Sequence, residues 1–356
     1  MKYALRRSCG FVSFAAALAL AGGAFAQDQS EELEDFTFMF PVESVTQYHP
    51  FFIAKELGYF EEEGLNVEFQ DAGGSSAAIQ QVIAGNADAA LPSPGAFLNA
   101  VAQGYDLKWV YSYQYGNIFT LAAPADSGIA SIEDLRGKSV GVSDLSGGEV
   151  PLVRAVLREA GLEVGSDVQL VPVGEGSALT IQAFETGQID AYSSNRFDIA
   201  TIEAQGIDMN AILPEAAQGF PSNGIVTTGE RLSENPEQIE GFVRAVAKAV
   251  AWSAANDEAA YELSAQISPE EFENEAVAKA SWETARELKT PPQELADAPL
   301  GSHFVEGFQA YHDFLRQGSE EEGALPKDVD LSAVLDSSLI EAANEFDKAA
   351  VVQDAR

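Results

Sequence analysis

Three Gly/Ser-rich segments carry the residue types in this sequence that could act on a ligand. They are 73–76 (Gly-Gly-Ser-Ser), 143–148 (Ser-Asp-Leu-Ser-Gly-Gly) and 174–177 (Gly-Glu-Gly-Ser). Each stands between a predicted strand and a predicted helix, where a loop presents free backbone N–H groups at the positive end of the helix. We therefore predict ligand contacts for Gly74, Ser75, Ser76, Ser146, Gly147, Gly176 and Ser177. The alternative for any one of these loops is that it only caps the helix that follows it and does not contact a ligand.

Histidine and cysteine usage restricts other chemistry. The three histidines, at 49, 303 and 312, have no metal-ligand spacing such as H-E-x-x-H. The one cysteine, Cys9, lies in an N-terminal segment that we expect to be removed, which leaves no thiol nucleophile, disulfide or thiolate metal site. A G-x-S-x-G motif is absent from the sequence as well. A hydrolase that uses paired carboxylates stays an alternative, because 56 acidic residues make any such pair uninformative.

The charge balance excludes some partners. The 356 residues include 56 acidic and 20 basic side chains, which gives a formal net charge of −36. Nucleic acid and anionic membrane surfaces are poor partners for such a chain. Because salt screens self-repulsion, we expect stability to rise with salt concentration.

The first 26 residues have the features of a signal peptide. Basic Lys2, Arg6 and Arg7 precede an apolar stretch at 11–20, and Ala24-Phe25-Ala26 forms a small-x-small cleavage site. We predict a signal peptide at 1–26, a disordered leader at 27–35 and export to the periplasm, with a signal anchor as the alternative. Cys9 precedes the apolar stretch, so a lipoprotein is not expected.

Alternating strand and helix patterns follow the leader and predict an α/β fold with largely parallel sheets. Strands are expected at 36–40, 67–69, 87–91, 108–113, 119–123, 139–142, 168–173 and 189–193, and helices at 51–60, 76–84, 97–103, 152–160 and 179–186. From about residue 230 the pattern becomes helical.

An internal repeat indicates two similarly built lobes. When the chain is shifted by 102 residues, seven of the sixteen positions from 74 to 89 match without a gap. Ligands bind outside the carboxyl ends of strands in such sheets, so two facing lobes would direct their Gly/Ser loops into one cleft. Asp88 and Asp190 are matching positions that begin strands. We interpret both as residues that fix turns at the end away from the cleft.

Three tyrosines, Tyr111, Tyr113 and Tyr115, alternate along one predicted strand and its end, so they can share one face. Tyr111 is expected in the core. Tyr113 and Tyr115 lie nearer the end of the strand, where we expect them to line the cleft and to suit a planar ligand by stacking.

Three further motifs resemble a known family. They are AKELGYFEEEGLNV at 54–67, AGNADAA at 84–90 and DLRGKSVGV at 134–142. They resemble periplasmic solute-binding proteins of the SsuA/ThiY-like group, which serve ABC importers of sulfonates, taurine and thiamine-precursor pyrimidines. The resemblance implies a type II periplasmic binding protein, in which two α/β lobes are joined by a hinge. Lobe one would be 36–121 plus 228–356, lobe two 122–227, and the crossovers would fall near 120–124 and 222–228.

The resemblance also implies site residues. In this family the segment before the first helix, here 43–50, reaches the cleft with Tyr48 and His49. Thiamine-precursor members tend to carry a histidine where this chain has Tyr48, which weakens the pyrimidine assignment. The loop at 192–196 reaches the cleft as well, and it contains Asn195 and Arg196; Ser93 lies in the matching loop of lobe one. Arg196 would anchor an acidic group of the ligand, unless it is a surface arginine paired with Asp198.

These observations predict the periplasmic substrate-binding component of an ABC importer, which captures a small organic solute by lobe closure. Its partners would be that solute and an ABC permease in the inner membrane, and the protein would be a monomer without cofactor or metal. The alternatives are a secreted enzyme of the same fold and a sensory ligand-binding module. The predicted cleft loops hold the acids Glu43, Asp71, Asp144, Glu149 and Glu175 against Arg196 alone. They accommodate a cationic amine or a zwitterion as readily as a sulfonate.

Overall fold

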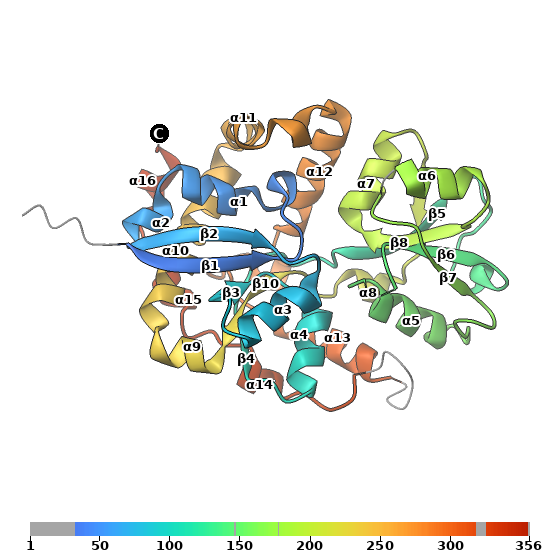
Figure 1. Ribbon diagram of the computed structural model, residues 1–356, viewed down its shortest axis with the longest axis horizontal. Helices are drawn as coiled ribbons and strands as arrows, with labels where there is room; N and C mark the ends of the chain where they lie inside the picture. Colours follow the sequence, from blue (N-terminus) through green and yellow to red (C-terminus); the bar gives the residue numbers. More distant parts are fainter. Residues whose placement is uncertain (1–32, 146, 177, 318–324, 355–356) are drawn as a thin grey trace, which may run out of the picture. The chain divides into compact units, whose positions relative to one another are not determined.

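Two five-stranded sheets organise the chain (Figure 1). The computed structural model describes residues 33–145, 147–176, 178–317 and 325–354. The first sheet has the order β2-β1-β3-β10-β4, with β1 Glu34–Phe40, β2 Leu65–Asp71, β3 Ala89–Ala90, β4 Leu107–Ser112 and β10 Gly224–Thr228. The second has the order β7-β6-β8-β5-β9, with β5 Phe119–Pro124, β6 Ser139–Val142, β7 Gln169–Pro172, β8 Ala191–Asn195 and β9 Met209–Ala211. The predicted α/β class is confirmed, but the sheets are mixed and not largely parallel, because β10 in the first sheet and β5 in the second pair antiparallel with both of their neighbours.

The two sheets repeat the same topology. In each, a central strand pairs in parallel with two neighbours, β1 with β2 and β3, and β6 with β7 and β8. A strand from the other half of the chain, β10 or β5, then adds in antiparallel direction. The pairs Phe38–Ala89 and Val140–Ala191 occupy equivalent positions and differ by 102 residues at both members. The repeat in the sequence therefore corresponds to two sheets of one design.

Asp88 and Asp190 fix the starts of parallel strands, as predicted. The Asp88 carboxylate accepts the Thr37 N–H at 2.7 Å, and the Asp190 carboxylate accepts the Ser139 N–H at 2.9 Å. Asp88 immediately precedes β3 and binds the backbone near the start of β1, and Asp190 immediately precedes β8 and binds the first residue of β6. This position lies at the amino ends of the strands, away from the loops that follow their carboxyl ends.

The chain passes between the sheets twice. It leaves β4 and enters β5 through residues 113–118, and it returns to β10 through residues 219–223. These passages precede the predicted crossovers by a few residues, because 120–124 pairs within the second sheet and 224–228 within the first. The passages bind each other, since the N–H groups of Tyr113 and Gln114 both donate to the Asn223 carbonyl, at 3.2 and 3.0 Å.

Helix α1 (Val45–Glu56) begins six residues earlier than predicted. The sequence pattern predicted a helix at 51–60. The helix instead contains Pro50 and bends at Tyr48, whose φ of −122° and ψ of 26° are not helical. Its first N–H groups are capped from a distance: the Glu271 carboxylate accepts from Val45 at 2.7 Å and from Thr46 at 3.0 Å.

The other helices cover the sheets. They are α2 Tyr59–Glu62, α3 Ser75–Ile83 and α4 Pro94–Ala102 in the first lobe, and α5 Val150–Glu159, α6 Ala178–Glu185, α7 Arg196–Ala204 and α8 Glu215–Gln218 in the second. The C-terminal part contains α9 Gly229–Glu234, α10 Pro236–Ala255, α11 Asp257–Ile267, α12 Glu275–Leu288, α13 Val305–Arg316, α14 Leu331–Val334, α15 Ile340–Ala343 and α16 Lys348–Val352. Short 3₁₀ turns occupy Glu133–Leu135, Pro269–Phe272 and Gln293–Leu295. Within the described ranges, none of the helices is long and apolar enough to cross a membrane.

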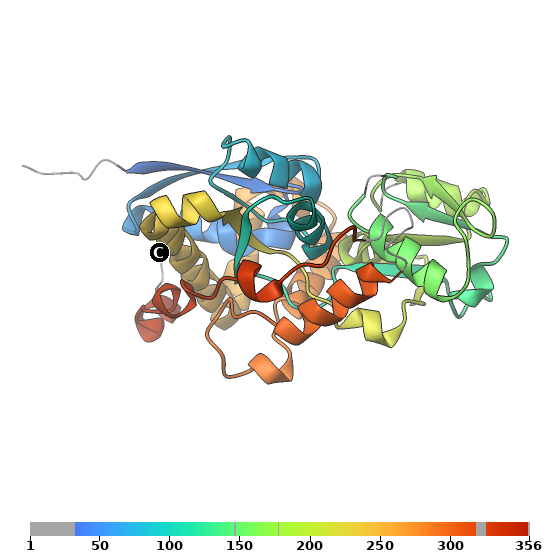
Figure 2. The ribbon, with the colours of Figure 1, turned by 90° about the horizontal axis from the view of Figure 1, so that it is seen from below.

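The C-terminal helices contact both lobes. Helix α10 packs on α1 and α2 of the first lobe. Helix α12 contacts both α1 of the first lobe and α7 of the second (Figure 1), and α13 lies against α5 of the second (Figure 2). The sequence prediction had grouped the whole tail with the first lobe. The apolar stripes in the sequence predicted that these helices would be packed against other elements. They could not predict which lobe each helix would contact.

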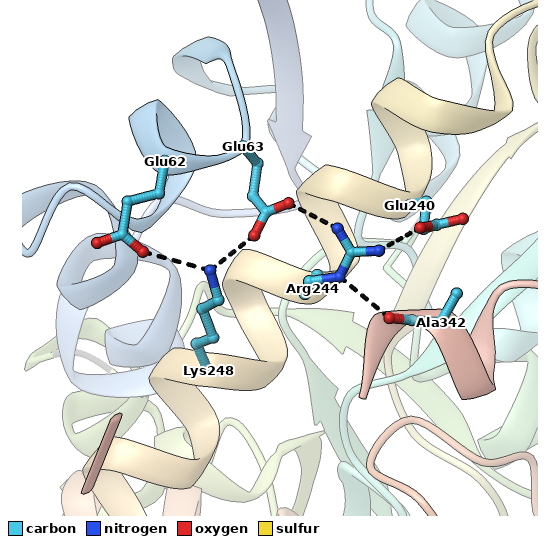
Figure 3. Close-up of polar contacts among 6 residues, drawn as sticks. All are labelled: Glu62, Glu63, Glu240, Arg244, Lys248 and Ala342. Carbon is cyan, nitrogen blue, oxygen red and sulfur yellow. Dashed lines mark hydrogen bonds and ion pairs between the residues drawn. The ribbon is translucent and has the colours of Figure 1, made fainter. Parts of the chain in front are cut away.

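A partly buried ionic network joins α10 to the end of α2 (Figure 3). Glu63 lies between two cations of α10, with its carboxylate oxygens 2.7 Å from Arg244 Nη1 and 2.7 Å from Lys248 Nζ. Glu240 and Glu62 supply one further carboxylate to Arg244 and to Lys248, respectively. Two of the scarce cations of this acidic chain are therefore used to fix a packing contact.

Candidate ligand-binding site

A cavity of about 550 Å³ lies among loops that belong to both sheets. The strands β1, β2, β6, β7 and β8 lead into it at their carboxyl ends, which is where ligands bind in parallel α/β sheets. From the first lobe it is lined by Pro41, Val42, Gln47, Tyr48, Asp71, Gly73, Gly74, Ser75, Ser76 and Ala77. From the second lobe and the two passages it is lined by Ile118, Phe119, Ser143, Asp144, Gly147, Gly148, Glu149, Glu175, Ser194, Asn195 and Asn223.

The structure brings most of the Gly/Ser candidates together at this cavity. Gly74, Ser75, Ser76 and Gly147 line it, whereas Ser146 and Ser177 lie outside the described residues. Gly74 has a φ of 136°, which admits the sharp entry into α3. Gly176 stands behind the cavity wall, where its N–H donates to the Tyr192 hydroxyl at 3.1 Å. A Cβ at Gly176 would collide with the backbone of Asp198, so this glycine permits close packing.

Several loop N–H groups that were predicted to bind a ligand donate instead to side chains of the protein itself. Asp71 Oδ1 accepts the Gly73 N–H at 2.6 Å. Glu149 Oε1 accepts both the Ser143 N–H at 2.8 Å and the Ser143 hydroxyl at 2.6 Å. The Gly176 N–H is bound to Tyr192, as described above. These loops therefore present carboxylates to the cavity alongside their remaining N–H groups.

Tyr48 and Phe119 give the cavity one aromatic ring from each lobe. The bend in α1 turns Tyr48 onto Phe40, and the two rings stack at 5.3 Å with an interplanar angle of 15°. Burial raises the pKa of the Tyr48 phenol, so it stays protonated at physiological pH. Its oxygen accepts a hydrogen bond from Asn223 Nδ2 at 3.4 Å.

Asn223 is a lining residue that sequence analysis missed. It is 2% exposed, and its Nδ2 also donates to the Leu91 carbonyl at 3.3 Å. That bond fixes the amide orientation, because a flipped amide would set two acceptors against each other. Oδ1 has no hydrogen-bond partner within the described part of the chain. The sequence placed residue 223 in a crossover and gave no sign that its side chain would reach the cavity.

His49 and Ser93 do not line the cavity. His49 follows Tyr48 in the bent helix and points to the other side, where its ring stacks on Trp282 at 3.9 Å with an interplanar angle of 21°. Burial, together with the adjacent Lys289 ammonium, lowers the pKa of His49. Ser93 is buried at the start of α4, and its N–H donates to Ser75 Oγ at 3.0 Å. Through this hydrogen bond, Ser93 fixes the side chain of Ser75, which lines the cavity.

Tyr113 and Tyr115 are not among the residues that line the cavity. Strand β4 ends at Ser112, and Tyr113 packs on Phe51 with ring centroids 4.9 Å apart. Tyr115 is buried as well, and its burial raises the pKa of its phenol to about 12. Tyr111 is buried in the core, as predicted. The aromatic rings in the described lining of the cavity are those of Tyr48 and Phe119.

Asn195 and Arg196 are neighbours with different surroundings. Asn195 lines the cavity and caps α7, because its Oδ1 accepts the Asp198 N–H at 2.9 Å. Arg196 is outside the cavity and forms an ion pair with Glu287 of α12. The sequence analysis had named Asp198 as its alternative partner. Asp198 instead accepts hydrogen bonds from Ser194 Oγ and Asn195 Nδ2, and burial raises its pKa to about 7.

Carboxylates dominate the electrostatics of the cavity. Asp71, Asp144, Glu149 and Glu175 line it, and Lys, Arg and His are absent from its described lining. Burial raises the pKa of Glu149, and the nearby Glu175 charge raises it further. Among the described residues, no group of three or more His, Cys, Asp or Glu side chains is placed to hold a metal ion.

Comparisons with known proteins agree with this fold. The riboflavin-binding protein RibY of Chloroflexus aurantiacus is 26% identical over 227 residues, which cover 63% of this chain and 64% of RibY, slightly less than two thirds of that relative. A solved structure from Bordetella bronchiseptica RB50 superposes with a TM-score of 0.69 at 22% identity, covering 88% of this chain and 98% of that one. The aliphatic sulphonate binding protein SsuA of Escherichia coli superposes with a TM-score of 0.62 at 16% identity, covering 85% and 92%.

These structural likenesses establish the two-lobed fold of periplasmic binding proteins, as the sequence motifs implied. The family model described as NMT1/THI5 like matches residues 45–260, more than half of the chain. The matched segment contains α1, both passages, every described residue of the second-lobe side of the cavity and α10. The chain therefore belongs to the NMT1/THI5-like family.

Proposed function

We propose that this protein is the solute-binding component of an ABC importer and that it captures a small organic solute by lobe closure. The observation that carries the proposal is the cavity of about 550 Å³, whose wall is shared between the loops of two sheets. A solute in this position contacts both lobes at once. The size falls within the range of small-molecule sites in proteins.

Closure requires a pivot, and the two passages supply it. The N–H groups of Tyr113 and Gln114 hold the Asn223 carbonyl, so the passages move as a pair while the lobes rotate. A ligand favours the closed form only through contacts that it makes better there. Tyr48 from one lobe and Phe119 from the other provide such contacts when they approach a common ligand.

The partners follow from the same proposal. The closed form would dock on an inner-membrane ABC permease, and the protein would act as a monomer in the periplasm. The predicted signal peptide lies outside the described residues; mass spectrometry of the exported protein should show Gln27 as the first residue. Binding without catalysis is supported by the sequence, which has no cysteine after residue 9 and no G-x-S-x-G motif.

A ligand screen with a structural readout tests the proposal. The chain from residue 27 is screened by thermal shift against amines, pyrimidines, flavins, sulfonates and aromatic acids. A ligand at 100-fold over its Kd should stabilise the protein by about 2.7 kcal/mol. Small-angle scattering with that ligand should show contraction. Absence of both effects across all classes would reject the proposal.

A matched pair of variants locates the binding event. Ser76→Trp fills the cavity from α3 and should abolish binding and contraction. Gln80→Trp adds the same side chain one turn later on the same helix, at an exposed position outside the cavity. The Gln80→Trp variant should leave ligand binding and contraction unchanged. Equal effects of the two variants would place the ligand elsewhere.

A further inference from the structure

We propose that the ligand of this cavity is an organic cation that carries N–H donors, such as an amine, amidine or guanidine, and not an anion such as a sulfonate. The inference rests on the proposed function and specifies its substrate class. It is carried by the charges of the lining, by the occupied loop N–H groups and by one buried acceptor that has no partner.

The first observation is that both lobes present negatively charged side chains to the cavity. Asp71 comes from the first lobe, and Asp144, Glu149 and Glu175 come from the second. Closure brings these carboxylates toward one another, and like charges oppose that approach. A cation between them removes the repulsion and makes closure depend on the ligand. An anion would increase the repulsion.

The second observation concerns the donors that an anion needs. Helix N-termini bind anions through free N–H groups. In the loops before α3, α5 and α6, Asp71 accepts the Gly73 N–H, Glu149 accepts the Ser143 N–H, and the Tyr192 hydroxyl accepts the Gly176 N–H. These three donors lie before the first helical turns, whose own N–H groups they do not include. Arg196, the cation predicted to anchor an acidic ligand, is paired with Glu287 outside the cavity. Three loop N–H groups and the predicted anchoring cation are thus already engaged within the protein.

The third observation is Asn223, at the junction of the passages. Its Oδ1 is buried without a partner in the described structure, while its Nδ2 is committed to Leu91 and Tyr48. A buried acceptor left unpaired is costly, so a ligand N–H group that reaches it gains affinity. This requirement distinguishes N–H cations from quaternary ammonium ions. The rings of Tyr48 and Phe119 add surfaces that attract either kind of cation.

Calorimetric titration of the ligand-free chain from residue 27 tests the inference. The probes are agmatine and putrescine as N–H cations, tetramethylammonium as a cation without N–H groups, taurine as a zwitterion, butanesulfonate as an anion and riboflavin as a neutral ligand. We expect an N–H cation to bind and to contract the protein in scattering. Glu175→Gln should weaken that binding about 10-fold or more.

Glu185→Gln is the matched control. It removes the same charge from an exposed position on α6, outside the cavity, and should change the affinity less than twofold. Asn223→Ala should weaken agmatine binding and leave any binding of tetramethylammonium unchanged.

The outcomes separate the two proposals. Contraction with butanesulfonate or riboflavin, at an affinity that Glu175→Gln does not lower, would overturn the cation assignment and leave the binding function standing. Equal affinities for tetramethylammonium and the N–H cations would overturn the donor requirement. Absence of binding and contraction with every probe and every class in the ligand screen would reject the binding function and this inference with it.

Discussion

Replacing Glu63 by glutamine should destabilise the protein strongly, because this carboxylate is the shared partner of two poorly exposed cations. The Glu63 side chain is 12% exposed, and those of Arg244 and Lys248 are 20% and 11% exposed. Glutamine keeps the volume of the side chain and one acceptor oxygen. It replaces the other oxygen with an NH₂ donor that must face a cation (Figure 3).

The geometry sets the magnitude. Breaking a buried ion pair by removing one partner costs about 3–5 kcal/mol. Each cation retains a second carboxylate, Glu240 for Arg244 and Glu62 for Lys248, so the cost should fall at the lower end of that range. We expect a loss of about 3 kcal/mol in the free energy of unfolding. For a chain of this size, this corresponds to a fall in Tm of about 5 °C.

Equilibrium urea denaturation and thermal melts of the chain from residue 27 measure the effect. Glu275→Gln is the control, because it removes the same charge from an α12 pair with Lys279 whose side chains are 75% and 60% exposed. That pair is solvated, and its loss should be barely measurable. The Glu63 effect should also persist at 1 M NaCl, since poorly exposed pairs are screened little. Equal losses in the two variants would refute the reasoning from burial.

Three further predictions follow from charge and placement. The Tm of the wild type should rise from low to molar NaCl, because salt screens the repulsion of a chain with 56 acidic and 20 basic residues; a flat or falling Tm would contradict this. Asp198 has a folded pKa of about 7 against about 3.9 when unfolded, so its stabilisation is complete below pH 4 and is lost as pH rises through 7. Asp198→Asn should remove that part of the pH dependence of Tm, and a wild-type minus variant difference that is constant from pH 4 to 8 would disprove it. Arg196→Ala should leave ligand affinity nearly unchanged in calorimetry, because the guanidinium pairs with Glu287 outside the cavity; a tenfold loss would return Arg196 to the site.

Local patterns determined much of this protein. The alternation of short apolar runs with helical segments predicted the α/β class, and the matched positions at a shift of 102 residues predicted two sheets of one design. Asp88 and Asp190 were interpreted correctly because each acts on the strand beside its own turn. Residues of the Gly/Ser loops line the cavity, because a glycine turn between a strand and a helix lies at the carboxyl end of the sheet.

Side-chain direction and distant partners were decided by the tertiary structure alone. Glu271 caps the start of α1 across a separation of 226 residues, which no local pattern shows. A local signal was present as well, because Ser44 is the N-cap and its hydroxyl accepts the Gln47 N–H at 3.4 Å, but Pro50 within the helix obscured it. The bend at Tyr48 then sends that ring to the cavity and His49 away from it. Asn223 reaches the cavity because the two passages bind each other, and Arg196 leaves it because α12 presents Glu287. Periodicity reports which face of an element is apolar, whereas the partner of a polar side chain depends on which distant segment packs beside it.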